Sequence, residues 1–251
     1  MSIEDEMQVY DSTLVSRLTG ETESYDNEFF PNIIRKREQE LIEKIVSSES
    51  PKLILDYGCG GGWLSILLQK WGFKSVGIDI SRNMVQNAKI VCPNADFIVC
   101  DAMRLPFKVD VFDFVIGKSV LHHLELKRAT NELKRISLSQ SVFLFMEPSL
   151  LNPLSAFGRR VFPMEGHTEG EKPYTPEYLR TSLILNNFTV EKLFSIFFFA
   201  YPAARFSKIT KLGPPRSIVF LAYLLESFFE KMPGLRYLNA NIVILARSSK
   251  K

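Results

Sequence analysis

The sequence is poor in the residues that would mark a disulfide-bonded or metal-binding protein. Its 251 residues include three cysteines and three histidines. Three cysteines cannot form an even disulfide framework, and reduced thiols are typical of the cytoplasm, where we expect this protein. No C-x-x-C spacing joins Cys59, Cys92 and Cys100, and the adjacent His122 and His123 cannot both face one ion from a helix. The sequence therefore predicts no metal site.

The chain also lacks a strong net charge, an export leader and a membrane-spanning run. Its 31 basic and 28 acidic residues leave a net charge of +3, which is too small to argue for nucleic acid as a partner. The first residues are acidic and lack the basic and then apolar order of a secretory signal, so we do not expect export. The apolar run at residues 218–225 is far shorter than the ~18 residues that a bilayer requires.

The most informative stretch is residues 53–65, LILDYGCGGGWLS. An apolar run, Asp56 and the alternating Gly58, Gly60 and Gly62 predict a buried strand, a turn of bare backbone and a helix. The third glycine of a dinucleotide fingerprint is replaced by tryptophan, and the Lys-Ser/Thr pair of a phosphate loop is missing. The pattern therefore favours a nucleoside without phosphates, and its alternative is a purely structural turn.

Polar side chains follow the next predicted strands. The β-branched strand at residues 75–80 contains Asp79, which lies roughly 20 residues beyond Asp56, the distance at which a second-strand acid meets a ribose. A carboxylate can accept hydrogen bonds from both hydroxyls of a cis-diol. Three more predicted strands precede polar groups: 97–100 before Asp101, 111–117 before His122 at a helix start, and 142–146 before Glu147. These groups share the ligand edge of a doubly wound sheet.

Taken in order, these motifs resemble class I S-adenosylmethionine-dependent methyltransferases. The resemblance covers about residues 52–148 and is closest to the small-molecule branch that includes C-methylating enzymes of quinone biosynthesis. It rests on the glycine turn, residues 77–81 with Met84, Asp101-Ala102 before residues 105–107, Phe112-Asp113 and residues 121–124. It implies an α/β fold with a doubly wound, seven-stranded, mostly parallel sheet, an antiparallel edge strand, and a helical insertion between strands six and seven.

The resemblance also implies a site for S-adenosylmethionine. The glycine turn would carry the methionine part of the cofactor, and Asp79 would hold the ribose. Asp101 and the Ala102 amide would read the adenine, with Ile80 and Met84 packed against its faces. The predicted cofactor-binding residues are Asp56, Gly58, Cys59, Gly60, Gly62, Asp79, Ile80, Met84, Asp101, Ala102, Met103 and Lys118.

Other features bear on the acceptor of the methyl group. The Asn-Pro-Pro-Tyr and Pro-Cys signatures of the family's DNA-methylating members are missing, so we predict a small or lipid-like acceptor and no nucleic acid. Asp113 resembles the family's structural acid and is left out of the site. The family's Lys-Pro-Gly-Gly turn before strand five is replaced by residues 136–141, where a serine-rich turn can serve the same geometry.

The flanking segments complete a single predicted domain, residues 1–251, whose 46% apolar content suffices for a large core. A helix over residues 33–46 is expected to bury Ile34, Leu41 and Ile45. Thr175-Pro176 predicts the start of a helix that ends near Asn187, and residues 189–200 and 241–246 are the expected sixth and seventh strands. The predicted segments are N-terminal helices at 1–48, the cofactor core at 52–148, a substrate-side loop, helix and sixth strand at 149–200, an insertion at 201–238, and the last strand and tail at 239–251.

The insertion is rich in apolar residues at helical spacing, among them Leu225, Phe228 and Met232, with Glu226 and Glu230 on the opposite face. One interpretation is an extra helix that buries its apolar face on the domain. The other is a substrate lid or a helix on a membrane surface, which favours an apolar acceptor and peripheral membrane contact. Basic residues before the helix fit anionic lipid, but a solvated basic loop is the commoner explanation of such residues.

The chemistry of the cofactor defines what the protein must supply. A sulfonium methyl group is already activated, so the protein mainly excludes water, aligns the acceptor and removes a proton where needed. Candidate bases are His122, Glu147, and His167 in the loop at residues 150–175; each also has a structural interpretation as a packed or surface side chain. The alternatives are a cofactor-binding regulatory or partner protein without turnover, and an NAD-type oxidoreductase. The oligomeric state is not predicted.

Overall fold

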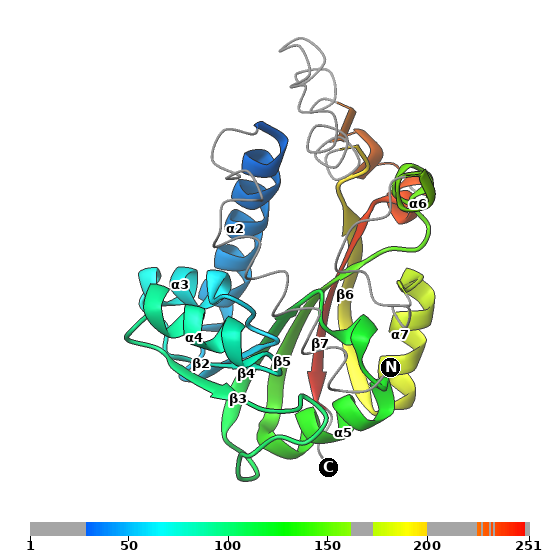
Figure 1. Cartoon of the computed structure of the whole chain (residues 1–251). Coiled ribbons are helices and arrows are strands. Elements are labelled where there is room, and N and C mark those ends of the chain that lie inside the picture. The colour runs from blue at the N-terminus through cyan, green and yellow to red at the C-terminus, as the bar shows by residue number, and fades with distance from the viewer. Residues whose placement is uncertain are drawn as a thin grey trace.

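The computed structural model describes residues 29–161, 173–199, 225–226, 228–230, 232 and 234–248. The predicted helix near the amino terminus, His167 and most of the predicted insertion lie outside these residues. The described part of the chain forms one seven-stranded sheet with helices on both faces (Figure 1). Its strands are β1 (Ile54–Tyr57), β2 (Ser75–Asp79), β3 (Asp96–Val99), β4 (Phe112–Lys118), β5 (Ser137–Pro148), β6 (Phe188–Ile196) and β7 (Asn241–Ser248).

The order of the strands, β3-β2-β1-β4-β5-β7-β6, is that of a doubly wound sheet with its switch point at β1 and β4. The strands from β3 to β5 in this order are parallel, so their carboxyl ends meet at one edge. β7 is antiparallel to both β5 and β6. The predicted mostly parallel, seven-stranded fold is confirmed, and the reversed strand lies one place inside the edge strand β6.

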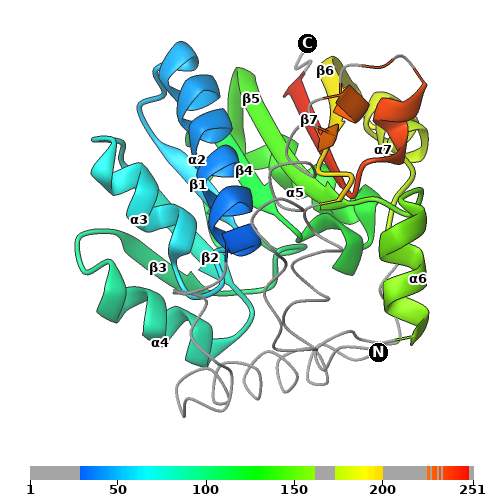
Figure 2. The same ribbon diagram turned by 90° about the horizontal axis from the view of Figure 1, so that it is seen from above.

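Helices form a layer on each face of the sheet (Figure 2). One layer contains α2 (Phe29–Glu49), α3 (Trp63–Lys70) and α4 (Arg82–Val91), and the other contains α5 (Leu126–Ile136) and α7 (Pro176–Leu185). Apolar residues on both sides of the central strands allow this arrangement. Along β7, for example, Ile244 packs in the core with α5 and α7, and the next residue, Leu245, packs in the core with α2 and α3.

Several local signals act as the sequence predicts. Thr175 caps α7 by accepting a hydrogen bond from the backbone N–H of Tyr178 (3.1 Å), and Asn187, with φ 60°, follows the end of this helix. Asp113 accepts hydrogen bonds from the backbone N–H groups of Lys52 (2.8 Å) and Leu53 (3.0 Å). These contacts give Asp113 its predicted structural role, because they tie β4 to the start of β1, away from the ligand edge.

Two segments between the strands differ from their predictions. The serine-rich residues 137–141 belong to β5, where Gln140 has φ 65°, the pairing register with β4 shifts, and the Ser141 hydroxyl donates to the carbonyl of Phe112 (2.8 Å). The expected long loop at residues 150–175 contains a helix, α6 (Pro153–Val161). None of the helices in the described residues combines the length and the apolar character needed to cross a bilayer.

In the described part of the insertion, the acidic side chains face the sheet. Glu226 is 3% exposed, and its carboxylate accepts hydrogen bonds from the backbone N–H groups of Phe198 (2.6 Å) and Phe199 (3.0 Å) just after β6. Glu230 accepts from the backbone N–H of Phe197 (3.2 Å). Phe228, which the interpretation as a packed extra helix would bury, is 53% exposed. The acidic face therefore points inward, because backbone donors at the end of β6 require acceptors.

Candidate functional site

The turn between β1 and α3 presents main chain at the carboxyl edge of the sheet. Gly58, Gly60 and Gly62 have positive φ angles of 74°, 50° and 86°. A Cβ atom added to Gly62 would lie 3.0 Å from the Cα of Ala88, so this glycine allows α3 to approach α4. A Cβ atom added to Gly60 would meet no heavy atom within 4 Å. The backbone at Gly60 therefore borders open space, as a ligand-binding turn must.

The Asp79 carboxylate, at the end of β2, fixes this turn. Its Oδ2 accepts a hydrogen bond from the backbone N–H of Gly60 (2.8 Å), and its Oδ1 accepts one from that of Ser81 (2.9 Å). The side chain thereby joins the glycine turn to the start of α4. A carboxylate can accept about four hydrogen bonds, so a group that holds a turn in this way can also receive the hydroxyls of a sugar.

The open backbone at Gly60 gives a direct test of ligand approach. We expect Gly60→Ala to weaken binding of S-adenosylhomocysteine by about tenfold or more, because the new methyl group enters the space that a ligand would use. Gly72→Ala is the matched control, since Gly72 also has a positive φ (84°) and no atom within 4 Å of an added Cβ. Both variants should lose about 1 kcal/mol of stability from left-handed backbone. Equal affinities in calorimetry for Gly60→Ala and wild type would contradict this assignment.

Asp56 lies beneath the turn and contacts α3. Its side chain is buried, and the Ser65 hydroxyl donates a hydrogen bond of 2.6 Å to its Oδ2. Burial raises the pKa of the Asp56 carboxyl from 3.8 to about 7; the hydrogen bond from Ser65 opposes this shift, and the nearby charge of Asp79 adds to it. Asp56 therefore supports the turn from the protein side.

The raised pKa of Asp56 makes the folded state take up a proton between about pH 4 and pH 7. The stability contributed by this carboxyl is fully present below about pH 4 and is lost as the pH rises towards 7. Asp56→Asn removes this dependence. In urea titrations, we expect the stability of the variant relative to wild type to rise by about 2 kcal/mol from pH 5 to pH 6.5. A constant difference over this range would show that Asp56 is ionised throughout.

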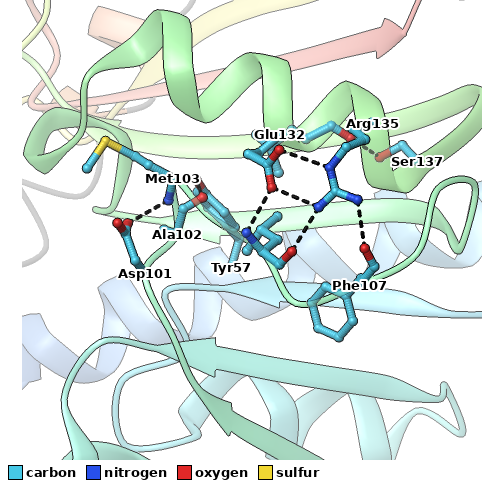
Figure 3. A network of polar contacts seen from close by, with 10 residues as sticks. Tyr57, Asp101, Ala102, Met103, Phe107, Glu132, Arg135 and Ser137 are labelled. Atoms are coloured by element: carbon cyan, nitrogen blue, oxygen red, sulfur yellow. Dashed lines mark hydrogen bonds and ion pairs between the residues drawn. The ribbon is translucent and has the colours of Figure 1, made fainter.

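A loop that follows β3 carries the residues predicted to contact adenine (Figure 3). The Oδ1 of Asp101 accepts a hydrogen bond from the backbone N–H of Met103 (2.7 Å), and the Tyr57 hydroxyl donates to the carbonyl of Ala102 (2.8 Å). Tyr57 is fully buried on β1, so the strand that leads into the glycine turn also holds this loop. Asp101, Ala102 and Met103 thus lie at the end of β3, next to β2 and Asp79.

Lys118, at the end of β4, contacts the helix α2. Its ammonium group lies 2.5 Å from Oε2 of Glu38 and 4.9 Å from the ring centre of Trp63. Glu38 is fully buried, and its Oε1 also accepts a hydrogen bond from the side-chain amide of Asn241 (3.4 Å). This ion pair joins α2 to β4 and β7 at the ligand edge.

His122 and Glu147 form a buried pair at the ends of β4 and β5. Nδ1 of His122 lies 2.7 Å from Oε2 of Glu147. Glu147 also accepts hydrogen bonds from the backbone N–H groups of Val120 (3.0 Å), Leu121 (2.9 Å) and His122 (3.3 Å). His122 belongs to a separate 3₁₀ helix, Leu121–His123, and not to the start of α5 as predicted. The carbonyl of Leu121 accepts a hydrogen bond from the Tyr174 hydroxyl (2.8 Å).

The other predicted site residues differ in how far the protein covers them. Cys59 and Met84 are buried and Ile80 is half-buried. Burial raises the pKa of the Cys59 thiol, which makes it a packed small side chain and not a nucleophile. Within the described residues, no three His, Cys, Asp or Glu side chains are grouped as a metal ion would require.

The prediction from sequence missed Glu38, Tyr57 and Tyr174. Glu38 had a detectable signal, because it stands four residues after Ile34 and four before Ile42 in a buried stripe of α2. That stripe contains Ile34, Ile42 and Val46, whereas the predicted Leu41 and Ile45 lie at its margin. Tyr57 and Tyr174 follow no local pattern that marks them, since their hydroxyls bond to backbone far away in the sequence.

Residues 55–145 match the family model described as a methyltransferase domain. A protein of Methanocaldococcus jannaschii is 35% identical over 123 residues, which are 49% of this chain and 46% of that protein. A tRNA (carboxymethyluridine(34)-5-O)-methyltransferase of Saccharomyces cerevisiae is 31% identical over 86 residues, 34% of this chain and 30% of that protein. This chain spans about half the length of the first relatives that it matches.

The solved structure of a SAM-dependent methyltransferase from Archaeoglobus fulgidus has the same fold. Its TM-score is 0.57 at 18% identity, and the match covers 84% of this chain and 94% of that one. The sheet order and the glycine turn agree with the family match, which indicates a methyltransferase domain of the class I type over residues 55–145. S-adenosylmethionine is the cofactor of this class.

Proposed function

We propose that this protein transfers the methyl group of S-adenosylmethionine to a small or lipid-like acceptor. The observation that carries the proposal is the open main-chain turn at Gly60, held by the Asp79 carboxylate at the switch point of the sheet. The turn can hold the amino-acid part of the cofactor and Asp79 the ribose hydroxyls. Asp101 and the Ala102 amide, one strand further along, are then placed to bind the adenine.

The cofactor supplies an electrophilic methyl group on a cationic sulfur. The chain has to exclude water, orient the acceptor and receive a proton where the acceptor loses one. We assign the proton to His122, because its Nδ1 is engaged by Glu147, which leaves Nε2 as the atom that can serve as a base. Glu147 acts as a positioning residue, since both its carboxylate oxygens accept hydrogen bonds.

Two findings support a small or lipid-like acceptor. The net charge of +3 provides little attraction for a polyanion. Apolar side chains are exposed on α6 and on the insertion, where Phe157 is 64% and Phe228 is 53% exposed. Both α6 and the insertion follow strands that end at the carboxyl edge, β5 and β6, where an apolar acceptor would approach.

A second candidate acceptor is tRNA, because several relatives are named as tRNA methyltransferases. Each of these relatives matches over 34% to 40% of this chain, a length comparable to that of the matched methyltransferase domain. A domain of this kind serves many acceptors, and recognition of RNA depends on further surfaces, so the likeness supports the cofactor more directly than the acceptor.

The experiment uses S-adenosylmethionine carrying a labelled methyl group, with a cell extract separated into lipids, small metabolites, RNA and protein. We expect label in the lipid or metabolite fraction. Label confined to RNA would establish the second candidate instead. Tight binding of S-adenosylhomocysteine with no labelled product would indicate a cofactor-binding protein without turnover, and thermal stabilisation by NAD alone would indicate an oxidoreductase.

A further inference from the structure

The loop that follows β3 is held in place by two charged residues of α5 that the proposed site does not include. The loop, residues 101–107, has no helix or strand of its own. Glu132 and Arg135 lie one turn apart on α5, on the face of the sheet opposite to α3. Their side chains point towards the end of the loop that carries Phe107, while Asp101, Ala102 and Met103 lie at its other end (Figure 3).

Arg135 binds two carbonyl groups of the loop at once. Its Nη1 donates to the carbonyl of Phe107 (2.7 Å), and its Nη2 donates to that of Leu105 (2.8 Å). Glu132 accepts a hydrogen bond from the backbone N–H of Leu105 (2.8 Å) through Oε2. Both polar groups of the Leu105 backbone are therefore bonded to α5, and the loop cannot shift along the helix without breaking these bonds.

The two side chains also hold each other. Nε of Arg135 donates to Oε1 of Glu132 (2.9 Å), and Nη2 donates to Oε2 (2.8 Å), which is a bidentate ion pair. The hydrogen bonds from Arg135 lower the pKa of the Glu132 carboxyl, and the same pair raises the pKa of Arg135. The ion pair thus orients both side chains and favours their charged forms, in which they bond to the loop. A planar guanidinium can make all these bonds together, whereas a lysine ammonium cannot.

We propose that the Glu132–Arg135 pair is a positioning device for cofactor recognition, which sets the loop so that Asp101 and the Ala102 amide match an adenine and reject other bases. The inference rests on the proposed function, because it assumes that this loop reads the base. Only a few residues separate the clamped Leu105 from the groups that would contact the base. Ala102 is held by a hydrogen bond from Tyr57, and Asp101 accepts one from the backbone of Met103. Loosening the clamp at Leu105 frees the irregular backbone that carries these groups.

The test compares binding of S-adenosylhomocysteine and S-inosylhomocysteine, which differ only at the base edge. Calorimetry on the full chain should show a clear preference for the adenosine compound in wild type. In Arg135→Gln we expect about tenfold weaker binding of the adenosine compound with little change for the inosine compound, so that the preference falls. Arg128→Gln is the matched control, because Arg128 lies on the same helix, is 59% exposed and pairs loosely with Glu125 (3.9 Å).

Further variants keep the result decisive. Arg135→Lys retains the positive charge but loses the planar guanidinium that makes several hydrogen bonds at once, so it should show an intermediate preference. If Arg135→Gln does not fold, this variant tests the inference. A folded Arg135 variant with the wild-type preference would overturn the inference, as would an equal loss of affinity for both compounds. Failure of wild type to bind S-adenosylhomocysteine would instead overturn the proposed function. A purely structural pair would lower the melting temperature and leave the preference unchanged.

Discussion

We expect Asp79→Ala to abolish measurable binding of S-adenosylhomocysteine, with an affinity loss of more than about a hundredfold. Hydrogen bonds to a charged group are worth about 1.5–3 kcal/mol each, and this carboxylate is proposed to receive two from the ribose. The substitution also releases the backbone N–H of Gly60, which Asp79 binds at 2.8 Å. Loss of the contact and loosening of the turn act in the same direction. Calorimetric titration of the purified variant measures the effect.

Asp96→Ala is the control for this substitution. Asp96 is an exposed aspartate on the neighbouring strand β3, at the end of the sheet away from the glycine turn. The Asp96→Ala variant should bind S-adenosylhomocysteine with wild-type affinity. A folded Asp79→Ala protein with wild-type affinity would remove Asp79 from the site. The variant does not separate an enzyme from a binding protein, because both need the cofactor; labelled methyl transfer separates them.

The parts of the site that follow from sequence are those that local backbone rules determine. Alternating glycines after a buried strand require a turn with positive φ, and Gly58, Gly60 and Gly62 form one. An acid at the end of the next strand, Asp79, must lie beside that turn, because parallel neighbouring strands end at a common edge. The period of apolar residues likewise predicts all seven strands to within a few residues, except for the irregular start of β5.

The parts that sequence does not predict depend on partners chosen in three dimensions. The helical period places residue 38 in the buried stripe of α2, but it does not show that a glutamate can be buried there, which depends on the partners Lys118 and Asn241. Glu226 is a second case. Its helix has an apolar face that ordinary patterning would bury, yet the backbone N–H groups of Phe198 and Phe199 require acceptors. No helical wheel contains that information, because those donors belong to another segment.

The same reasoning changes the interpretation of Glu147. From sequence it is a carboxylate at the ligand edge and hence a candidate base. In the structure it is fully buried and serves four hydrogen-bond donors of one tight turn. A carboxylate surrounded in this way stabilises the turn that carries His122. Glu147 would therefore affect turnover indirectly, by orienting the imidazole of His122.

We expect Glu147→Ala to lower the free energy of unfolding by about 5 kcal/mol. The substitution leaves the backbone N–H groups of Val120, Leu121 and His122 and one imidazole nitrogen without their acceptor, and each unsatisfied buried group costs about 1–3 kcal/mol. At about 2–4 °C per kcal/mol for a chain of this size, the melting temperature should fall by more than about 10 °C. Urea unfolding followed by circular dichroism measures both the midpoint and the slope.

Two further variants separate the backbone contacts of Glu147 from its contact with the imidazole. His122→Ala keeps the three backbone bonds to Glu147, so it should cost less stability than Glu147→Ala while removing methyl transfer and preserving affinity for S-adenosylhomocysteine. Glu125→Ala, at an exposed acid that directly precedes α5, should change stability by less than about 0.5 kcal/mol. A loss of under about 1 kcal/mol in Glu147→Ala would mean that water replaces the carboxylate, and the buried acid would then have no part in holding His122.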